Sequence, residues 1–479
     1  MLNHQWKPCA TLVRAMSTRA AVSANGAHIS APSTAAASDQ DAAALGRFFY
    51  RNRMVNQWGA LPARRTTLQQ LIMFGRSARR NRALLMESAN YLRTEMTRRI
   101  AHRLIDMQSI PFVAMSNEQL DSIYQFHWRT FEMLRRIDII DTVEANEHLI
   151  RVVTELLSER KSKLELIAGI SRECVLYMEP DAVNYFLARM LRSQISREVL
   201  AKQHIALTMM QSPDAKSHAS RTTIGMVDTQ LNVGESVRRS VWYARESIAS
   251  IHGWDINDRR IPEVKILGDV NTYIAYLPAH LDFILLELLK VSMQSTMHFH
   301  NLQDKDGADF VVPPIKLRIV NSPDYSDIEI RISDEGGGFQ IAKGTRNLSN
   351  EAIRARGPLL MPGIEQVNGD FNTGLAWSFI NIGEQLDRMN IQLEETATAD
   401  ISRNSVDGAV TPDPTASYPG GDGLMRLSVL NMESKNGLPI VNLYAELFGG
   451  ALDFRSMDGF GNNVYLRLPK LGTGKEQHE

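Results

Sequence analysis

Cysteine is nearly absent from the chain, because Cys9 and Cys174 are the only two in 479 residues. Two cysteines cannot form a disulfide framework or a cysteine zinc site, and such low usage is typical of proteins in a reducing compartment. Neither residue is a good candidate for a catalytic thiol. The chemistry of this protein therefore has to be sought in other side chains.

An excess of charge is absent too, since Lys+Arg 53 and Asp+Glu 54 leave a formal charge of -1. This balance gives no electrostatic reason to expect nucleic acid as a partner. No apolar run reaches the roughly 18 residues of a membrane span, because even the run "FILLELL" is interrupted by Glu287. The sequence also lacks a G-x-x-x-x-G-K-[ST] string, which excludes a Walker-type nucleotide site, and the H-x-x-x-H spacing of a metal site.

The length and composition are those of a globular protein with more than one domain, at 44% hydrophobic and 22% charged residues. The first forty residues differ from the rest. They contain Lys7, Arg14 and Arg19, many Ser, Thr and Ala, and no acidic residue before Asp39. This composition predicts a mitochondrial transit peptide over residues 1–40, with a disordered tail as the alternative.

The remainder divides into a helical half and a mixed half. From about Leu68 to Val241 the apolar residues recur at helical spacing, so we predict a bundle of several long helices over residues 61–245. After about Ile261 the segments "IKLRIV" and "DIEIRIS" alternate as strands do, with helices between them. We therefore predict an α+β fold in which residues 255–470 form one sheet covered by helices on one face.

One predicted helix is unusual. The stretch "LDFILLELLKVSMQST", residues 281–296, is densely apolar but carries Glu287, Lys290 and Gln294. At 3.6 residues per turn these side chains fall on one side of the helix, with Val291 among them. Buried charges are costly unless something pairs or uses them, so this polar stripe is a candidate site.

Glycine-rich segments follow. "SDEGGGF" stands directly after the strand "IEIRI", and its three glycines let backbone N–H groups approach a ligand closely. The carboxylate of Asp334 at the strand end can accept a hydrogen bond from an exocyclic amine such as that of adenine. Taken alone, the string also fits an ordinary glycine-rich turn.

"NGLPIVNLYAELFGG", residues 436–450, is a glycine turn that opens a helix, whose free N–H groups and dipole favour an anion such as phosphate. "GALDFRSMDGFGNNVYLRL" reads as two strands joined by a glycine-flanked turn. This second segment predicts a hairpin that closes the sheet.

In this order the segments resemble the mitochondrial 2-oxoacid dehydrogenase kinases, the pyruvate and branched-chain members of the GHKL superfamily. "LDFILLELLKVSMQSTM" resembles their N-box, "DEGGGF" their G1 box, "NGLPIVNLYAELFGGAL" their G2 box, and "DGFGNNVYLRL" their closing hairpin. The likeness continues upstream through "TLQQLIMFG", "VNYFLARMLRSQISREVLAKQH" and "LPAHL", and the wording leans toward the branched-chain kinase. The resemblance runs from about Leu61 to Pro469 and implies a helical regulatory and docking domain followed by a GHKL-type α/β sandwich that binds nucleotide.

The resemblance also implies roles for individual residues. Glu287 would be the general base for the acceptor serine, with Lys290 beside it. ATP would be bound by six residues, Asp334, Gly336, Gly338, Gly437, Leu438 and Asn462. Mg²⁺ is implied as well, but Val291 stands where the family has its metal-binding Asn, and an apolar side chain cannot coordinate a hard cation. No metal ligand is therefore assigned, and Gln294, about one turn away, is the possible substitute.

Other positions depart from the family pattern. Glu433 and Lys435 occupy the first two glycine positions of the G2 box, which keeps only Gly437. Asn462 replaces a Thr and Ser292 an Ala.

The stretch between the G1 and G2 boxes is longer than the family pattern, and we expect an enlarged ATP lid over about residues 340–432. The segment "NTGLAWSF", Asn372 to Phe379, has a Gly-Leu start like the G2 box, but no strand and hairpin follow it, so it is assigned to the lid. Within the lid we expect a mobile loop from Glu394 to Gly423. Residues 471–479 are a predicted C-terminal tail.

Two functions remain open. The first is a mitochondrial serine/threonine kinase that transfers the ATP γ-phosphate to the E1 subunit of a branched-chain or pyruvate dehydrogenase complex, as Glu287, Lys290 and the intact G1 box indicate. The second is a nucleotide-binding pseudokinase that regulates or partners an active paralogue, as Val291 and the altered G2 box indicate. A GHKL ATPase of the chaperone or mismatch-repair kind is disfavoured, because a helical bundle precedes the nucleotide domain.

The resemblance finally implies location and partners. These are the mitochondrial matrix, the E1 subunit, the lipoyl-bearing E2 core and a second copy of the chain in a homodimer. His204 in "AKQH" matches a histidine of the family's helical domain. Because a lone histidine in a helix is more often structural than catalytic, we predict a structural role for it.

Overall fold

The computed structural model describes residues 53–78, 81–159, 170–171, 174–211, 222–300, 312–321, 326–338, 438–457 and 459–470. The chain divides into two units, Met1–Arg53 and Met54–Glu479, and nearly all described residues belong to the second. Several predictions of the preceding section fall outside the described residues: the segment 1–40, the lid with "NTGLAWSF" and the loop Glu394 to Gly423, the turn residues Glu433, Lys435 and Gly437, and the tail 471–479.

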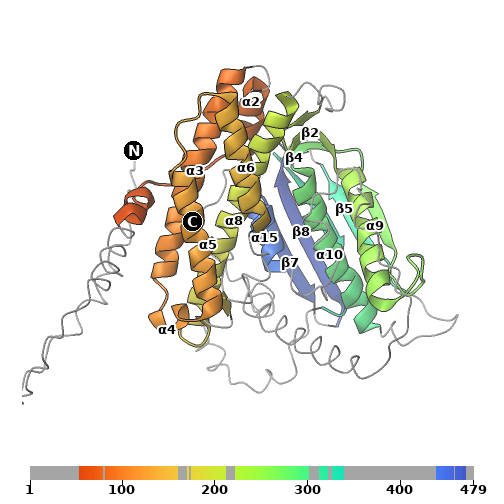
Figure 1. Ribbon diagram of the computed structural model, residues 1–479. Coiled ribbons are helices and arrows are strands. Elements are labelled where there is room, and N and C mark those ends of the chain that lie inside the picture. The colour runs from red at the N-terminus through yellow and green to blue at the C-terminus, as the bar shows by residue number, and fades with distance from the viewer. Residues whose placement is uncertain are drawn as a thin grey trace, which may run out of the picture. The chain divides into compact units, whose positions relative to one another are not determined.

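The first part of the second unit is helical (Figure 1). Its helices are α2 (Leu68–Ala78), α3 (Arg82–Gln108), α4 (Phe112–Met115), α5 (Glu118–Arg135), α6 (Val143–Glu159) and α8 (Pro180–Gln211). Local chemistry sets several of their starts. Asn81 and Asn117 cap α3 and α5 by accepting backbone N–H groups of the first turn, and α8 opens with Pro180, whose missing N–H costs nothing there.

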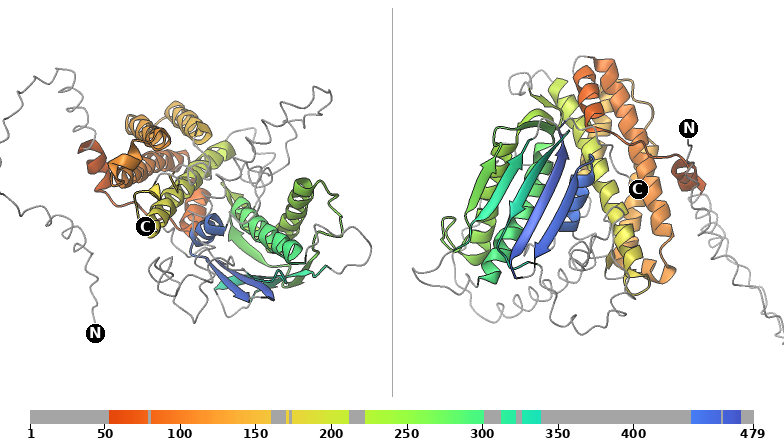
Figure 2. Two further views of the ribbon diagram at one scale, coloured as in Figure 1. Left: turned by 90° about the horizontal axis from the view of Figure 1, so that it is seen from below. Right: turned by 180° about the vertical axis from the view of Figure 1, so that it is seen from behind.

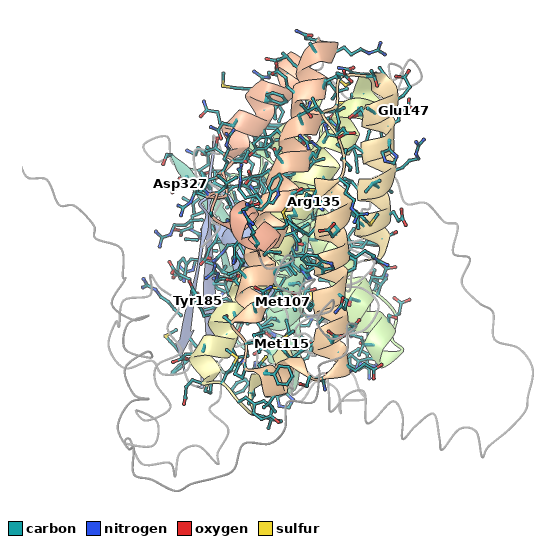
Figure 3. The ribbon with its side chains drawn as sticks, turned by 60° about the vertical axis from the view of Figure 1, so that its left-hand side comes forward. Met107, Met115, Arg135, Glu147, Tyr185 and Asp327 are labelled. Atoms are coloured by element: carbon teal, nitrogen blue, oxygen red, sulfur yellow. The ribbon has the colours of Figure 1, made fainter. Side chains whose placement is uncertain are left out.

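These helices pack as a bundle around α3, which contacts α5, α6 and α8 (Figure 2). α3 and α8 run in opposite directions, so Met107 near the end of α3 and Tyr185 near the start of α8 lie at the same end of the bundle (Figure 3). Apolar side chains of the long helices fill the space between them, among them Leu92, Ile100, Leu104, Phe131, Leu187 and Leu191.

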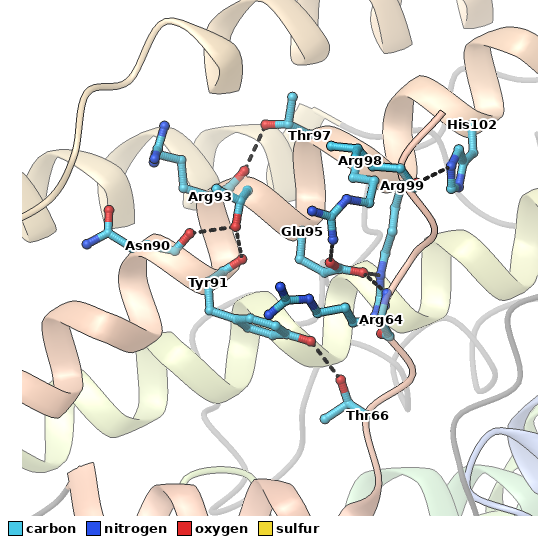
Figure 4. A network of polar contacts seen from close by, with 12 residues as sticks. Arg64, Thr66, Asn90, Tyr91, Arg93, Glu95, Thr97, Arg98, Arg99 and His102 are labelled. Atoms are coloured by element: carbon cyan, nitrogen blue, oxygen red, sulfur yellow. Dashed lines mark hydrogen bonds and ion pairs between the residues drawn. The ribbon is translucent and has the colours of Figure 1, made fainter. Parts of the chain in front are cut away.

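A buried ion pair fastens the segment before α2 to the bundle (Figure 4). Glu95 Oε1 accepts from Arg99 Nε at 3.1 Å and from the backbone N–H of Arg64 at 2.8 Å. Arg99 Nη2 donates to the Arg64 carbonyl oxygen at 2.9 Å, and Arg99 Nη1 donates to Ser196 of α8. Both charges are thus matched by hydrogen bonds, as a buried pair requires.

His204 of α8 is enclosed in the same bundle. Its Nε2 lies 2.8 Å from Asn146 Oδ1 of α6, and its Nδ1 lies 3.0 Å from the Ser88 hydroxyl of α3. With the amide oxygen as acceptor, Nε2 carries the hydrogen and Nδ1 accepts from Ser88, which is the neutral imidazole. Burial lowers the pKa of His204 to about 4. A neutral, doubly hydrogen-bonded ring that joins three helices fits the structural role predicted for it.

The second part contains two sheets. A small antiparallel sheet has the order β1 (Thr223–Ile224), β2 (Val227–Asn232), β4 (Tyr273–Tyr276). The main sheet has the order β3 (Val264–Gly268), β5 (Ile315–Val320), β6 (Asp327–Ser333), β8 (Gly461–Pro469), β7 (Ala451–Met457). β3 and β5 are parallel, and the other neighbours are antiparallel.

Three helices lie on one face of the main sheet (Figure 2): α9 (Val233–His252), α10 (Pro278–Phe299) and α15 (Leu438–Glu446). α10 packs against α9 and α15 and contacts β6, while α15 contacts β7, β8 and α8. The strands alternate buried and exposed residues, and their buried side chains face these helices, for example Ile328, Ile330 and Ile332 of β6.

The predicted α+β fold is confirmed, as are the strands "IKLRIV" and "DIEIRIS", the closing hairpin and the helix around residues 281–296. The range predicted as helical up to Val241 also contains the strands β1 and β2, which form only by pairing with each other and with β4. Because Met54–Glu479 forms one unit, the domain limits 61–245 and 255–470 stay predictions. None of the described helices is long and apolar enough to cross a membrane.

We expect acid to destabilise the fold through His204. Between its folded pKa of about 4 and the ordinary value of 6.5, only the unfolded chain binds the proton. The free energy of unfolding should therefore fall by about 1.4 kcal/mol per pH unit below the unfolded pKa, until the loss is complete near the folded pKa. Urea denaturation across this range measures the slope in the wild type and in His204→Gln, where the titrating group is gone. Equal slopes in the two proteins would contradict this assignment.

Candidate functional site

Helix α10 carries the polar stripe through the centre of the sheet-bearing part. Pro278 supplies its first turn, and Leu281, Ile284, Leu285 and Leu289 have no exposed surface. Such side chains cover nearly the whole circumference, because α10 is enclosed by α9, by α15 and by the sheet. A charged residue in the middle of this helix is therefore removed from water.

Glu287 and Lys290 are removed in this way, with 5% and 1% of their surface exposed. Lys290 Nζ donates to Glu287 Oε1 at 3.0 Å, one turn apart on the same helix. Desolvation of such a pair can cost as much as its attraction gains, so an apolar pair would serve the stability of the helix at least as well. The pair is thus better explained by chemistry at this place than by packing.

Val291 is also buried, at 7% exposed, and Gln294 is half-buried one turn further on. The side chain of Val291 has no oxygen for Mg²⁺, which prefers carboxylate, carbonyl and water ligands. Among the described residues, no group of three or more His, Cys, Asp or Glu side chains could hold a metal ion. The described side chains therefore do not fit a protein-built Mg²⁺ site, and the amide of Gln294 is what the stripe retains.

Asp334 lies at the end of β6 and is largely buried. Its Oδ1 accepts three hydrogen bonds, from the backbone N–H of Gly336 at 3.0 Å and from the backbone and side-chain N–H groups of Asn462 at 3.1 Å each. The backbone N–H of Asp334 donates to the Asn462 carbonyl oxygen at 3.0 Å. This carboxylate therefore joins the end of β6, the glycine loop and the start of β8.

Burial raises the pKa of Asp334, while the hydrogen bonds from Gly336 and Asn462 act in the opposite direction. The Ser292 hydroxyl of α10 lies near enough to lower this pKa too, although its oxygen does not meet the geometry of a hydrogen bond. Ser292 thus brings the N-box helix beside the Asp334 carboxylate. The two motifs are neighbours in space.

The glycine loop after Asp334 is held between α10 and the β7–β8 hairpin. Ser295 Oγ donates to the Gly336 carbonyl oxygen at 3.1 Å, and the N–H of Gly459 donates to the Gly337 carbonyl oxygen at 2.9 Å. A Cβ on Gly336 would lie 2.4 Å from Ser295 Oγ, and one on Gly461 would lie 2.0 Å from the Asp334 carbonyl oxygen. The close approach of Ser295 at Gly336, and of the Asp334 backbone at Gly461, therefore favours glycine at these positions.

Asn462 supplies the buried side of this arrangement, with 2% of its surface exposed. Its side-chain N–H group is committed to Asp334, and its Oδ1 has no hydrogen-bond partner within the described part of the chain. A buried amide oxygen without a donor costs free energy that a ligand amine or a water could recover. Asp334 and Asn462 together therefore present acceptors suited to an exocyclic amine.

Leu438 is the first residue of α15 and is buried. α15 lies against α10, where the Tyr444 ring packs on Phe283 and His280 with centroid distances of 4.8 and 4.7 Å. The structure thus brings α10, the Asp334 loop, the start of β8 and α15 to one face of the sheet. Gly437 lies just outside the described residues.

Sequence reasoning missed part of this site. Ser295 contacts the glycine loop, and His300 Nε2 lies 3.0 Å from the Glu335 carbonyl oxygen. Ser292 and Ser295 are one helical turn apart and lie beside the polar stripe. This spacing could have indicated that the same side of the helix contacts the glycine loop.

Comparison with known proteins gives a consistent result. The family model for mitochondrial branched-chain alpha-ketoacid dehydrogenase kinase matches residues 65–228. The mitochondrial pyruvate dehydrogenase (acetyl-transferring) kinase of Arabidopsis thaliana is 25% identical over 426 residues, which cover 88% of this chain and 94% of the relative. The chain is thus similar, at about 25% identity, to mitochondrial 2-oxoacid dehydrogenase kinases along most of its length.

Another relative of this kinase family, the mitochondrial pyruvate dehydrogenase (acetyl-transferring) kinase 2 of Saccharomyces cerevisiae, is 23% identical over 449 residues, covering 88% of this chain and 85% of the relative. The matched family model spans the helices α2 to α8 and ends in β2, whereas the pairwise matches reach across most of the chain. The similarity to these kinases, first indicated by four motifs of the sheet-bearing part, therefore extends to the helical part.

We expect Gly338→Ala to destabilise the protein more than Gly459→Ala. Both glycines have left-handed backbones, with φ of +76° and +79°, so each variant should lose about 1 kcal/mol through strain. A Cβ on Gly338 would also lie 2.6 Å from the Met457 carbonyl oxygen, whereas nothing lies within 4 Å at Gly459. Displacing Met457 should add about 1–3 kcal/mol. Urea denaturation measures the stability of both variants. Equal stability would show that the loop can rearrange around the added Cβ at no cost in free energy.

Proposed function

We propose that this chain is a protein serine/threonine kinase of the mitochondrial matrix that transfers the γ-phosphoryl group of ATP to the E1 subunit of a 2-oxoacid dehydrogenase complex. The observation that carries this proposal is the buried Glu287–Lys290 pair, which has a chemical use in the enzyme and little use in the fold. The names of the relatives support the same reaction.

In this proposal Glu287 is the general base. As the serine oxygen of E1 attacks the γ-phosphorus, the bond from that phosphorus to the β–γ bridging oxygen breaks and ADP leaves. The hydroxyl proton moves to a carboxylate oxygen of Glu287. A positioned base of this kind contributes about 10²–10⁴ in rate. Lys290 orients the carboxylate through its hydrogen bond, in which Nζ lies 3.0 Å from Glu287 Oε1.

ATP is the second substrate, and its two ends have separate candidate contacts. The hydrogen bonds of Asp334 to Gly336 and Asn462 end on Oδ1, which leaves Oδ2 to accept from the exocyclic amine of adenine. Gly336 and Gly338 shape the loop beside it. The N–H groups at the start of α15, next to Gly437 and Leu438, favour the phosphates through the helix dipole.

Mg²⁺ would supply charge neutralisation of the phosphates when bound. Because the described side chains do not fit a metal site, the roles above assign no step to the ion. The same observation favours a second candidate function, a nucleotide-binding pseudokinase that regulates an active paralogue, since Val291 removes an oxygen ligand from the stripe.

The partners follow from the family. We propose that the helical part docks the lipoyl-bearing E2 core and that two copies of the chain form a homodimer. The relatives are named for pyruvate dehydrogenase and the family model for the branched-chain ketoacid dehydrogenase, so both E1 subunits are candidate substrates.

We expect Asp334→Ala to weaken ATP binding by about 1–3 kcal/mol, because the exocyclic amine loses its charged acceptor. Asp327→Ala is the matched control, since Asp327 lies exposed at the opposite end of the same strand. Isothermal titration of ATP into both variants and the wild type measures the difference. Unchanged affinity in folded Asp334→Ala would remove the nucleotide role of this loop.

We expect Glu287→Gln to abolish phosphate transfer to E1 while ATP affinity stays within about threefold, because the amide keeps the shape but cannot take the proton. Val291→Asn should raise transfer, since it restores an amide oxygen beside Lys290. Radiolabelled transfer to pyruvate and branched-chain E1 compares the two variants with the wild type.

The same assay separates the two candidate functions. Wild-type transfer that Glu287→Gln abolishes would exclude the pseudokinase. If neither the wild type nor Val291→Asn transfers phosphate although both bind ATP, the kinase function is excluded.

A further inference from the structure

Glu446 is the last residue of α15, so its carboxylate lies at the C-terminal end of the helix. The C-terminal end of a helix dipole is itself negative, so a carboxylate there is unfavourable unless another group compensates it. Asn442 Nδ2, one turn earlier, donates to Glu446 Oε1 at 2.8 Å. This neutral contact orients the carboxylate but leaves its charge unbalanced.

The balancing charge comes from another part of the fold. Arg192 of α8 donates through Nη2 to Glu446 Oε2 at 3.0 Å, although the two residues are 254 positions apart. The Arg192 side chain is 9% exposed and that of Glu446 is 23% exposed. Limited solvent access makes this pair stronger than an ordinary surface pair.

Arg192 belongs to a longer row of charges. One turn earlier on α8, Arg189 Nη2 lies 3.1 Å from Asp106 Oδ1, and Asp106 Oδ2 lies 2.8 Å from Arg103 Nη2 within α3. Burial, followed by the nearby cations Arg189 and Arg192, lowers the pKa of Arg103 to about 10. Two sets of ion pairs therefore meet on α8: Arg103, Asp106 and Arg189 join it to α3, and Arg192 and Glu446 join it to the end of α15. The residues Met107 and Tyr185 mark the end of α3 and the start of α8 in Figure 3.

α15 is well suited to pass on a displacement. It is nine residues long, about 13 Å at the rise of an α-helix, and its first eight residues are buried, so it is short and closely packed. On its other side the Tyr444 ring packs against Phe283 and His280 of α10, the helix that carries Glu287. A shift at the Glu446 end consequently changes where Leu438, at the opposite end, lies relative to α10.

We propose that Arg192 is a positioning residue for the nucleotide site, which through Glu446 fixes the phosphate-facing end of α15 and so couples the helical bundle to ATP binding. The inference rests on the proposed function, because it takes the start of α15 as the phosphate contact. It goes beyond that function by naming the pair that joins the two parts.

The role predicts a selective effect on ligands. Phosphates contact the start of α15, whereas adenine contacts Asp334, which is anchored by Asn462 and Gly336 and has no part in the ion row. Breaking the Arg192–Glu446 pair should therefore weaken ATP binding and leave adenosine binding unchanged. A loss of general stability would weaken both ligands alike.

The test is a charge reversal with rescue. Isothermal titration of ATP and of adenosine is compared for the wild type, Arg192→Glu, Glu446→Arg and the double variant. We expect each single variant to raise the Kd of ATP about tenfold and to change that of adenosine less than about twofold, and the double variant to return within about threefold of the wild type. Arg189→Glu is the matched control, because it breaks an ion pair of the same helix that does not reach α15.

Four results with the variants would overturn the inference: unchanged ATP affinity in folded single variants, an equal loss for adenosine, no recovery in the double variant, or a matching loss of ATP affinity in Arg189→Glu. If Arg192→Glu does not fold, Arg192→Gln and Glu446→Gln provide the same comparison with no reversed charge. Wild-type protein that binds adenosine and ATP with no phosphate preference would overturn the inference alone. Wild-type protein that binds neither ligand would remove the proposed function with it.

Discussion

The buried pair of Glu287 and Lys290 is the constraint on which the rest of the sheet-bearing part depends. Two opposite charges on one turn of α10 are removed from water there, and the hydrogen bond between them offsets part of the desolvation cost. α9, α15 and the inward side chains of β6 provide the enclosure. The same packing that buries α10 also places neighbouring elements beside the helix that carries Glu287 and Lys290.

The second anchor is Asp334, whose Oδ1 collects N–H groups from a loop and from β8. With Ser292 and Ser295 of α10 beside this loop, the carboxylate cannot shift without moving the helix that bears the ion pair. Glu287, the proposed base, and Asp334, the proposed adenine contact, are thereby held relative to each other by the same few contacts. Catalysis by orientation needs this rigidity, because small displacements of the reacting groups cost large factors in rate.

Long periodic segments made much of this fold predictable. α10 and the strands β5 to β8 follow directly from helical spacing, alternation and glycine turns. β1 and β2 were missed because strands this short are specified by their partners and have no pattern of their own. The contact of Asp334 with Asn462 joins residues 128 positions apart, and Arg192 looks like a solvated residue of a long helix until Glu446 is placed beside it. Sequence periodicity carries no information about such partners.

The order of strands has a consequence for the synthesis of the protein. β8 lies inside the main sheet, between β6 and β7, although it follows every other described element in the chain. Ser333 and Asn463, which face each other across β6 and β8, are 130 positions apart. On the ribosome β3, α10, β5 and β6 therefore emerge long before β8, and β6 presents an open edge that can pair with strands of other chains. Until β8 is made, the backbone N–H and C=O groups along that edge of β6 lack the partners that β8 provides.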